Sequence, residues 1–349
     1  MKDIAKSAGV SVCTVSLVLN GKAKNRVSER NARKVLDVAR ELGYVPNSTA
    51  RTLRMGRSHV LGFISDVIAT TPYAGDLLLG AQDAARQLGY IVLTANTGDD
   101  RELEIEEISA LRRYQVDGFL YALMYHQRVH LPEAIGDVPT VVVDGEDEDG
   151  RVPSVFPDDL RIGYDATKRL IDAGCQRIAY FGASDAVIAQ FDRFQGYKDA
   201  LAEAGMAVDP VLLENTEEGR IAEAHAERLI SEGKPDGIFC FNDRRVPALY
   251  HIAERHGLVV GRDLAIVGVD NQRIIGDMLI PELTTVELPH YDMGFEAVLR
   301  LVAMLDGPDD VRRLCEETGR AMPGDDLELR IHCRLLNKQS VPSSMNPRS

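Results

Sequence analysis

Residues 1–21 read MKDIAKSAGVSVCTVSLVLNG, and this stretch decides how the start of the chain folds. Its first apolar residues recur at helical spacing, and Gly9 ends that first helix. Ser11 then supplies a side-chain oxygen that can cap a second helix. Two short helices joined at a glycine turn predict a helix-turn-helix. Its apolar positions are Ile4, Ala5, Ala8, Val12, Val15, Val18 and Leu19.

A third helix is predicted to pack against this pair. Ser28 can cap its start, and Gly43 ends it. We expect its apolar residues to close a small core; they are Val35, Leu36, Ala39 and Leu42.

The second helix of such a motif reads DNA, because its first turns meet base edges in the major groove. Charge supports this interpretation. Residues 1–58 hold twelve Lys and Arg against four Asp and Glu, a net charge of +8, whereas the whole chain carries −14 and the remainder therefore −22. A basic end on an acidic chain indicates contact with phosphate through that end. The candidate base contacts are Ser11, Val12, Cys13, Thr14, Ser16 and Leu17.

A short basic connector, residues 47–58, follows this headpiece. Pro46 prevents the preceding helix from continuing, Asn47 can cap a new one, and Gly56 ends it. A segment of this length cannot hold a helix alone in water. We therefore expect it to be disordered when free and helical when docked on DNA.

From Val60 onward the sequence alternates between strand-like and helical stretches, which indicates α/β lobes with parallel sheets. VLGFISD at 60–66 resembles IAYFGASD at 178–185, and VDGFL at 116–120 resembles PDGIF at 235–239. This weak repeat predicts two similar lobes in tandem with a ligand cleft between them. The strand-like runs are 60–65, 90–95, 118–122, 140–143, 177–182, 237–241 and 264–269, and the helical stretches include 77–88, 102–114, 195–204, 221–232 and 246–255.

Polar side chains follow the ends of the predicted strands. Asp66, Asp144, Asn242 and Asp270 each come directly after one, with Asp243 and Asn271 beside the last two. Arg193 stands near Phe191 in a predicted loop, residues 191–194. Carboxylates, an amide and a guanidinium beside aromatic rings suit a neutral polyhydroxylated ligand, whose hydroxyls both donate and accept hydrogen bonds. An aspartate after a strand can equally be a helix cap, and only the convergence of several favours a site.

Enzymatic motifs are missing from the sequence: there is no G-x-G-x-x-G, Walker loop, G-x-S-x-G or H-E-x-x-H. We expect no catalytic residues, no cofactor and no metal. The charged, amphipathic start and the lack of an apolar run of about eighteen residues predict a cytoplasmic protein without membrane contact. The cysteines are scattered singly, which predicts neither disulfides nor a zinc site; they are Cys13, Cys175, Cys240, Cys315 and Cys333.

Several motifs together resemble the lactose/galactose-repressor family of bacterial transcription regulators. In the headpiece they are DIA at 3–5, GVS at 9–11, TVS at 14–16, VLNG at 18–21, GYVPN at 43–47 and ARTL at 50–53. Looser motifs follow in the right order: VDG at 116–118, RFQGY at 193–197, FND at 241–243, VGVD at 267–270 and PELTTV at 281–286. The resemblance covers nearly the whole chain, to about Leu336.

The resemblance implies a repressor of carbohydrate uptake or catabolism genes that binds a pseudo-palindromic double-stranded DNA operator as a homodimer associated with the nucleoid. A hinge helix in the connector would insert Leu53 into the minor groove. A sugar-like effector, held by Arg193, Asn242 and Asp270 with Asp144 and His290 at the rim, would control operator affinity. The remaining residues assigned to DNA are Asn20, Asn47, Ala50, Arg51 and Arg54, and Tyr73 is assigned to the effector.

The expected fold is thus an all-α helix-turn-helix headpiece with a hinge helix, followed by a periplasmic-binding-protein-like α/β core. We divide the chain into headpiece 1–46, hinge 47–58, a two-lobed domain 59–336 and a disordered tail 337–349. The first lobe takes about 59–156 and 289–320, and the second about 157–288 and 321–336.

Three departures and three alternatives remain. Leu17 and Cys13 replace the polar base readers usual in the family, so the family's operator sequence cannot be assigned to this chain. Leu288-Pro289-His290 matches the family's segment between the lobes only partly, and no leucine heptads support a tetramer.

The effector could instead be a corepressing purine or other metabolite. A transport-type solute-binding protein would share the two-lobed fold, but would not explain the basic headpiece. A sugar-modifying enzyme would need the phosphate-binding glycines that this sequence lacks.

Overall fold

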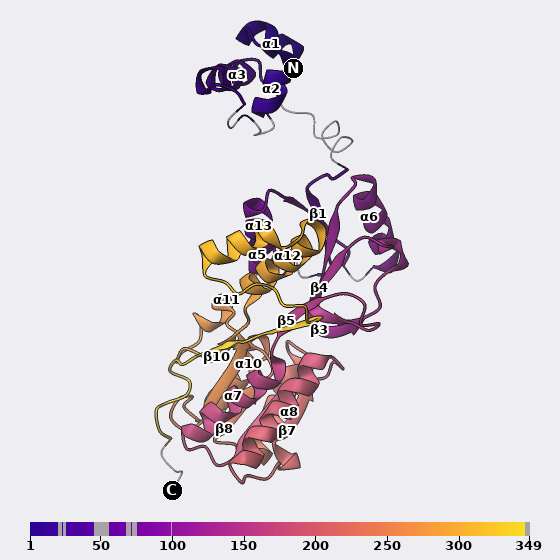
Figure 1. Ribbon diagram of the computed structural model, residues 1–349. Coiled ribbons are helices and arrows are strands. Elements are labelled where there is room, and N and C mark those ends of the chain that lie inside the picture. Colours follow the sequence, from indigo (N-terminus) through magenta and orange to yellow (C-terminus); the bar gives the residue numbers. More distant parts are fainter. Residues whose placement is uncertain are drawn as a thin grey trace. The chain divides into compact units, whose positions relative to one another are not determined.

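The computed structural model describes residues 1–19, 23, 26–44, 56–67, 71, 75–98 and 100–345 (Figure 1). These residues form two units, Met1–Ser58 and His59–Ser349, and each is described by itself. The predicted hinge helix falls largely on residues 45–55, which lie outside the described residues.

The first unit is the predicted helix-turn-helix with a third helix. The elements are α1 (Lys2–Ala8), α2 (Val12–Leu19) and α3 (Glu29–Glu41). Gly9 follows α1 with φ 66°, a left-handed conformation that favours glycine, and it turns the chain toward α2. Ser28 caps α3 by accepting a hydrogen bond from the backbone N–H of Asn31. Apolar side chains from all these helices form the core: Ile4, Ala5, Ala8, Val15, Val18, Val35 and Ala39.

Two residues assigned to that core lie outside it. Leu36 and Leu42 are 45% and 53% exposed. On α3 the buried positions are Val35 and Ala39, four residues apart, which form one narrow stripe. Leu36 is one position away from that stripe, so its side chain is turned toward solvent.

The second unit contains two sheets, one in each lobe, as predicted, and each sheet has six strands (Figure 1). In the first lobe the strand order is β11-β5-β4-β3-β1-β2, and every pair in it is parallel. Its strands are β1 (Val60–Ser65), β2 (Ile91–Asn96), β3 (Gly118–Val129), β4 (Thr140–Asp147), β5 (Ser154–Pro157) and β11 (Glu328–Ile331). Its helices include α5 (Gly75–Gln87), α6 (Arg101–Arg113), the short η2 (Glu133–Ile135), α12 (His290–Asp306) and α13 (Pro308–Thr318).

The second lobe repeats this order as β12-β10-β9-β8-β6-β7, with β12 antiparallel to β10. Its strands are β6 (Ile178–Ala183), β7 (Leu213–Thr216), β8 (Gly237–Cys240), β9 (Ala265–Asp270), β10 (Thr284–Glu287) and β12 (Arg334–Leu336). Its helices include α7 (Asp159–Asp172), α8 (Ile188–Glu203), α9 (Ile221–Arg228), α10 (Val246–Arg255) and α11 (Arg273–Gly276), with short turns η3 (Pro210–Leu212), η4 (Leu229–Gly233) and η5 (Asp243–Arg245). The repeat noticed in the sequence places β1 and β6 at equivalent positions in the two sheets.

The chain passes between the lobes after β5, after β10 and again between β11 and β12. The third crossing shows that the predicted limit of the first lobe was wrong. Residues 321–336 were assigned to the second lobe, but β11 pairs with β5 in the first lobe. β11 reads ELRI, whose polar–apolar alternation is typical of a half-buried strand, but four residues do not show which sheet they join.

The predicted disordered tail is also corrected for its described part. Ser340, Val341 and Met345 are buried in the second lobe. The hydroxyl of Ser340 donates to the carbonyl of Ile266 at 2.6 Å and accepts from the backbone N–H of Thr284 at 2.7 Å. Backbone-directed bonds of this kind allow a polar, aperiodic segment to pack.

Within the described residues, no helix is both long enough and apolar enough to cross a bilayer.

Candidate functional site

The helix α2 presents the residues predicted to read bases. Ser11, Val12 and Cys13 are exposed, and Thr14 is partly exposed, as are Ser16 and Leu17. The Ser11 hydroxyl oxygen accepts a hydrogen bond from the backbone N–H of Thr14 at 3.0 Å, which caps α2 as expected. Val15 and Val18 point into the core and hold this face outward.

Seven residues assigned to DNA or effector lie outside the described residues. They are Asn20, Asn47, Ala50, Arg51, Leu53, Arg54 and Tyr73.

In the second unit, two predicted aspartates, Asp66 and Asp270, lie at the carboxyl ends of strands, one in each lobe. Asp66 follows β1, and its carboxylate accepts the backbone N–H of Met124 at 2.8 Å. Asp144 lies in β4, and Asp270 ends β9. Both have positive φ, 56° and 108°, and non-glycine residues persist in such conformations only when their surroundings hold them.

Burial changes the acidity of these two carboxyls. It raises the pKa of Asp144 to about 7; the nearby negative charge of Asp159 acts in the same direction, and His126 and Arg193 oppose it. Burial also raises the pKa of Asp270 to about 7 against the charge of Arg193. Near neutral pH both carboxyls can therefore either donate or accept hydrogen bonds, which suits hydroxyl groups.

Arg193 is buried inside the second lobe. It lies on α8, not in a loop, because that helix begins at Ile188, seven residues before the predicted start. Its Nε donates to Asp159 at 2.7 Å, and its Nη1 donates to the carbonyl of Phe241 at 2.7 Å. The guanidinium also lies over the Phe241 ring, 4.6 Å from its centroid. Phe191 is on the same helix but is 59% exposed, and it does not join this group.

Asn242 is held by a neighbouring ion-pair group. Its amide Nδ2 donates to Glu218 at 2.9 Å, and its Oδ1 accepts from Arg245 at 3.0 Å. Arg245 and Arg244 also contact the Glu218 carboxylate, at 3.1 and 2.6 Å. Glu218 and both arginines were not predicted from the sequence. Arg244 and Arg245 directly follow the Asn242-Asp243 pair, but Glu218 lies 24 residues away from Asn242 and carried no signal.

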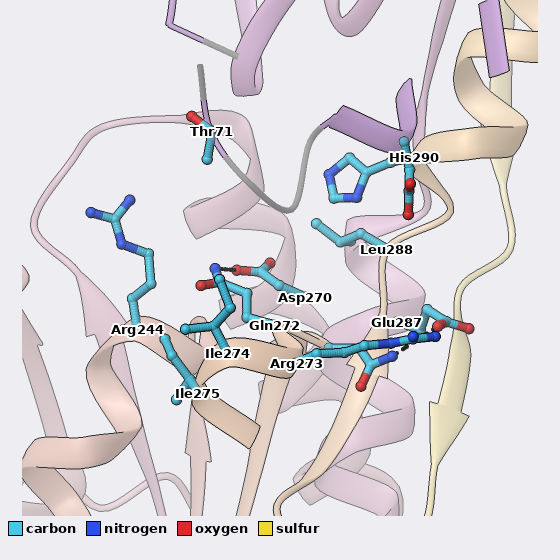
Figure 2. Close-up of a pocket in the computed structure, with 12 residues that line it drawn as sticks. Thr71, Arg244, Asp270, Gln272, Arg273, Ile274, Ile275, Glu287, Leu288 and His290 are labelled. Atoms are coloured by element: carbon cyan, nitrogen blue, oxygen red, sulfur yellow. Dashed lines mark hydrogen bonds between the residues drawn. The ribbon is translucent and has the colours of Figure 1, made fainter. Parts of the chain in front are cut away.

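A pocket of about 780 Å³ opens at the ends of β9 and β10 (Figure 2). It contains two of the predicted residues, Asp270 and His290, whereas Asp66, Asp144, Arg193 and Asn242 do not line it. Its walls combine charged, amide and aliphatic groups: Thr71, Asp76, Arg244, Asp270, Asn271, Gln272, Arg273, Ile274, Ile275, Glu287, Leu288 and His290.

Polar side chains of this pocket are oriented by hydrogen bonds to one another. Gln272 Nε2 donates to Asp270 at 2.7 Å, and Asn271 Nδ2 donates to Glu287 at 2.8 Å (Figure 2). Burial, together with the charge of Arg193, lowers the pKa of His290 to about 4. His290 is therefore neutral near pH 7 and offers one donor and one acceptor. Such a pocket can bind a small polar molecule and fix its orientation.

Among the residues that the structure describes, no group of three His, Cys, Asp or Glu side chains could hold a metal ion. The thiol of Cys13 is exposed, and those of the other four cysteines are buried.

Comparison with known families matches both units. The model for "Bacterial regulatory proteins, lacI family" matches residues 1–47. The model for "Periplasmic binding proteins and sugar binding domain of LacI family" matches residues 58–320, about three quarters of the chain.

Curated relatives span nearly the full length. The HTH-type transcriptional regulator RegA of Clostridium saccharobutylicum is 34% identical over 313 residues, 88% of this chain and 92% of the relative. The sucrose operon repressor of Escherichia coli is 30% identical, covering 90% and 97%. The transcriptional repressor PurR of Vibrio cholerae serotype O1 (strain M66-2) is 30% identical, covering 90% and 94%.

A solved structure, a complex of the transcriptional regulator CelR with cellobiose, matches 97% of this chain and 98% of its own. Its TM-score is 0.65 and its sequence identity 26%.

Proposed function

The chain belongs to the LacI family of bacterial regulatory proteins, and we propose that it is a repressor whose operator affinity is set by a neutral sugar bound in the pocket between its lobes. Family membership makes it a DNA-binding transcriptional regulator and not an enzyme. The pocket at the ends of β9 and β10 carries the remainder of the proposal.

The chemistry of the pocket favours a polyhydroxylated ligand over a phosphorylated one. Asp270, Gln272, Glu287 and His290 supply carboxylate, amide and imidazole groups, which pair with hydroxyls in either direction. The lining holds two arginines, Arg244 and Arg273, against the carboxyl groups of Asp76, Asp270 and Glu287, so it has no excess of positive charge that would favour a phosphate. A volume of about 780 Å³ lies within the usual range for small-molecule sites. The CelR–cellobiose complex and the sucrose operon repressor are consistent with this class.

The headpiece supports the DNA part of the proposal. We assign base reading in the major groove to the exposed face of α2, with Cys13 and Leu17 giving this chain its own operator preference. Asn20 and the connector residues Asn47, Ala50, Arg51, Leu53 and Arg54 complete the assignment, with Leu53 as the minor-groove wedge. Two half-sites require two headpieces, so the active species is a homodimer on a pseudo-palindromic operator.

The sugar controls operator affinity because it binds one arrangement of the two lobes more tightly than another. A sugar that contacts both lobes stabilises one angle between them and changes the spacing of the two headpieces in the dimer. As a DNA-binding regulator the protein works in the cytoplasm, and we place it at the nucleoid while it is bound to operator.

The test is operator binding measured by fluorescence anisotropy, with labelled DNA from the upstream region of the protein's own gene. The expected result is tight, salt-sensitive binding that cellobiose, sucrose or another neutral sugar of a panel weakens, with no effect of the matching sugar phosphates. Tightening by a purine base would instead identify a corepressed regulator. The absence of site-specific binding would contradict the proposal altogether.

A further inference from the structure

Strand β3 runs seven residues beyond its predicted end and carries two side chains to the second lobe. Its pairing with β4 is interrupted between Ala122 and Gln127. Within this irregularity Tyr125 has φ 67°, a conformation unusual for a side chain of its size. The Tyr125 hydroxyl lies 3.3 Å from the Glu218 carboxylate, and the next residue, His126, meets α7. A strained segment of the first lobe thus reaches into the second lobe at two consecutive positions.

His126 is enclosed between two carboxylates. Its Nδ1 lies 2.9 Å from Asp159 of the second lobe, and its Nε2 lies 3.1 Å from Glu146 of its own lobe. The ring stacks on Phe156 at 4.2 Å, and only 2% of the side chain is exposed. An ionised carboxylate can only accept hydrogen bonds, so both ring nitrogens must carry hydrogen for both contacts to be favourable. The geometry therefore selects the imidazolium form.

Asp159 shares its carboxylate between His126 and Arg193. One oxygen faces His126, and the other accepts from Arg193 Nε at 2.7 Å. The glycines Gly163 and Gly196 allow α7 and α8 to pack with direct backbone contact, which keeps Asp159 beside Arg193. Arg193 in turn lies close enough to Asp270 and His290 to influence the pKa of both. Ionic contacts therefore join the first lobe to Arg193, and the charge of Arg193 acts on two residues of the pocket wall.

We propose that His126 of the first lobe is a positioning residue for Arg193 of the second lobe, acting through Asp159, and that loss of the His126 proton loosens this link. The proposal rests on the proposed function in one respect: it takes the pocket at the ends of β9 and β10 as the effector site.

The charges around His126 support this proton sensitivity. Burial acts to lower the pKa of His126, but the hydrogen bond to Asp159 and the surrounding negative charges outweigh it, and the net shift is upward from 6.5. The charged groups facing it are Asp144 and Glu146 on β4, Asp159 on α7, and Asp192 and Arg193 on α8. Arg330 on β11 lies over the Phe156 ring, and Arg128 on β3 pairs with the other oxygen of Glu146 at 3.1 Å. Because the pKa is raised on folding, the contact stabilises the fold fully below pH 6.5, and this contribution declines as the pH rises through the folded-state value.

The test uses NMR on the full chain without any effector. Histidine ring signals are followed against pH in protein labelled with ¹³C-histidine, and His126→Gln identifies the His126 signal among those of the eight histidines. We expect the His126 pKa to lie above 6.5 and to fall by about one unit or more in Asp159→Asn. Asp158→Asn removes a neighbouring charge and is the matched control, in which the His126 pKa stays close to the wild-type value.

The link to Arg193 is read from the Nε–H signal of that residue. In the wild type we expect this signal to shift along the same titration curve as His126. In His126→Gln its exchange with water should be about tenfold faster, whereas in the control His130→Gln, at the exposed residue directly after the same strand, it should not change. A merely structural His126 would give no shared titration.

An Arg193 signal that ignores the titration of His126, or a His126 pKa below 6.5, would overturn the proposal. The titration is read in the wild type, and if His126→Gln fails to fold, the His126 signal is assigned from its nuclear Overhauser contacts with the Phe156 ring, 4.2 Å away. Failure of the sugar panel with a shared titration intact would instead contradict only the proposed function.

Discussion

The Glu218 carboxylate accepts a hydrogen bond from the side-chain amide of Asn242 at 2.9 Å. The same carboxylate also contacts Arg245, whose side chain is only 1% exposed. Glu218 therefore both orients Asn242 and balances a buried cation.

Glu218→Ala should lower the free energy of unfolding by about 3 kcal/mol, because it leaves the buried Arg245 without its carboxylate partner. Urea denaturation followed by circular dichroism measures this change. The exposed neighbour Glu217→Ala is the control and should stay within about 0.5 kcal/mol of the wild type. Equal loss in both variants would mean that Glu218 does not have this role.

Gly163→Ala should separate the two helices that carry Asp159 and Arg193. A Cβ at Gly163 would collide with the backbone carbonyl of Arg193. Because the clash is with the backbone, no change of side-chain rotamer can relieve it. We expect a loss of about 1–3 kcal/mol in unfolding free energy and weaker binding of whichever sugar the panel identifies. Gly75→Ala, in a helix with open space around the added methyl, is the control and should be neutral or slightly stabilising. A stable Gly163→Ala chain would show that α7 and α8 tolerate separation.

Asp270→Asn should stabilise the protein in a pH-dependent way. Folding raises the pKa of Asp270 from 3.8 to about 7, so the folded state favours its neutral form. The wild type therefore loses stability as the pH rises from about 4 to 7, and the variant, which cannot ionise there, does not. The difference should be negligible at pH 4 and reach at most about 4 kcal/mol above pH 7.

Thermal unfolding from pH 4 to 8 measures this difference, with the exposed Asp277→Asn as the control. A difference between Asp270→Asn and the wild type that does not vary with pH would contradict the expectation.

Leu53→Ala should weaken operator binding strongly while leaving sugar binding unchanged. A leucine wedge gains its energy from unstacked bases, and alanine is too small to keep the DNA kinked. Anisotropy with operator DNA and calorimetric titration with the identified sugar separate the two effects. Unchanged operator affinity would remove the wedge role from Leu53.

Periodicity in the sequence predicted the central strands and most helices, because buried parallel strands are continuous apolar runs. Val60–Ser65 was placed correctly to the residue, and the repeat between β1 and β6 was visible in the sequence. The edge strands β11 and β12 were not predicted. The four residues of β11 alternate between polar and apolar, and this short signal was overlooked, whereas the three residues of β12 carry no periodic signal.

The site was predicted less completely than the fold. Asp270 and His290 line the pocket, but Arg193 is engaged by Asp159 and Phe241 behind it. His126 and Asp159 were missed because their role depends on the contact between their side chains, and folding alone brings the two lobes that carry them together. An aspartate at a helix start, as Asp159 is, looks in sequence like an ordinary member of a helical first turn.

The last strands have a consequence for synthesis. β11 and β12 come from one short segment near the end of the chain, and each completes the sheet of a different lobe. During synthesis, the headpiece leaves the ribosome with all the residues of its own core. Both lobes are incomplete until β11 and β12 have been made, more than 260 residues after β1. The DNA-reading end is therefore ready before the part that senses the ligand, and a nascent chain released early would carry the first without the second.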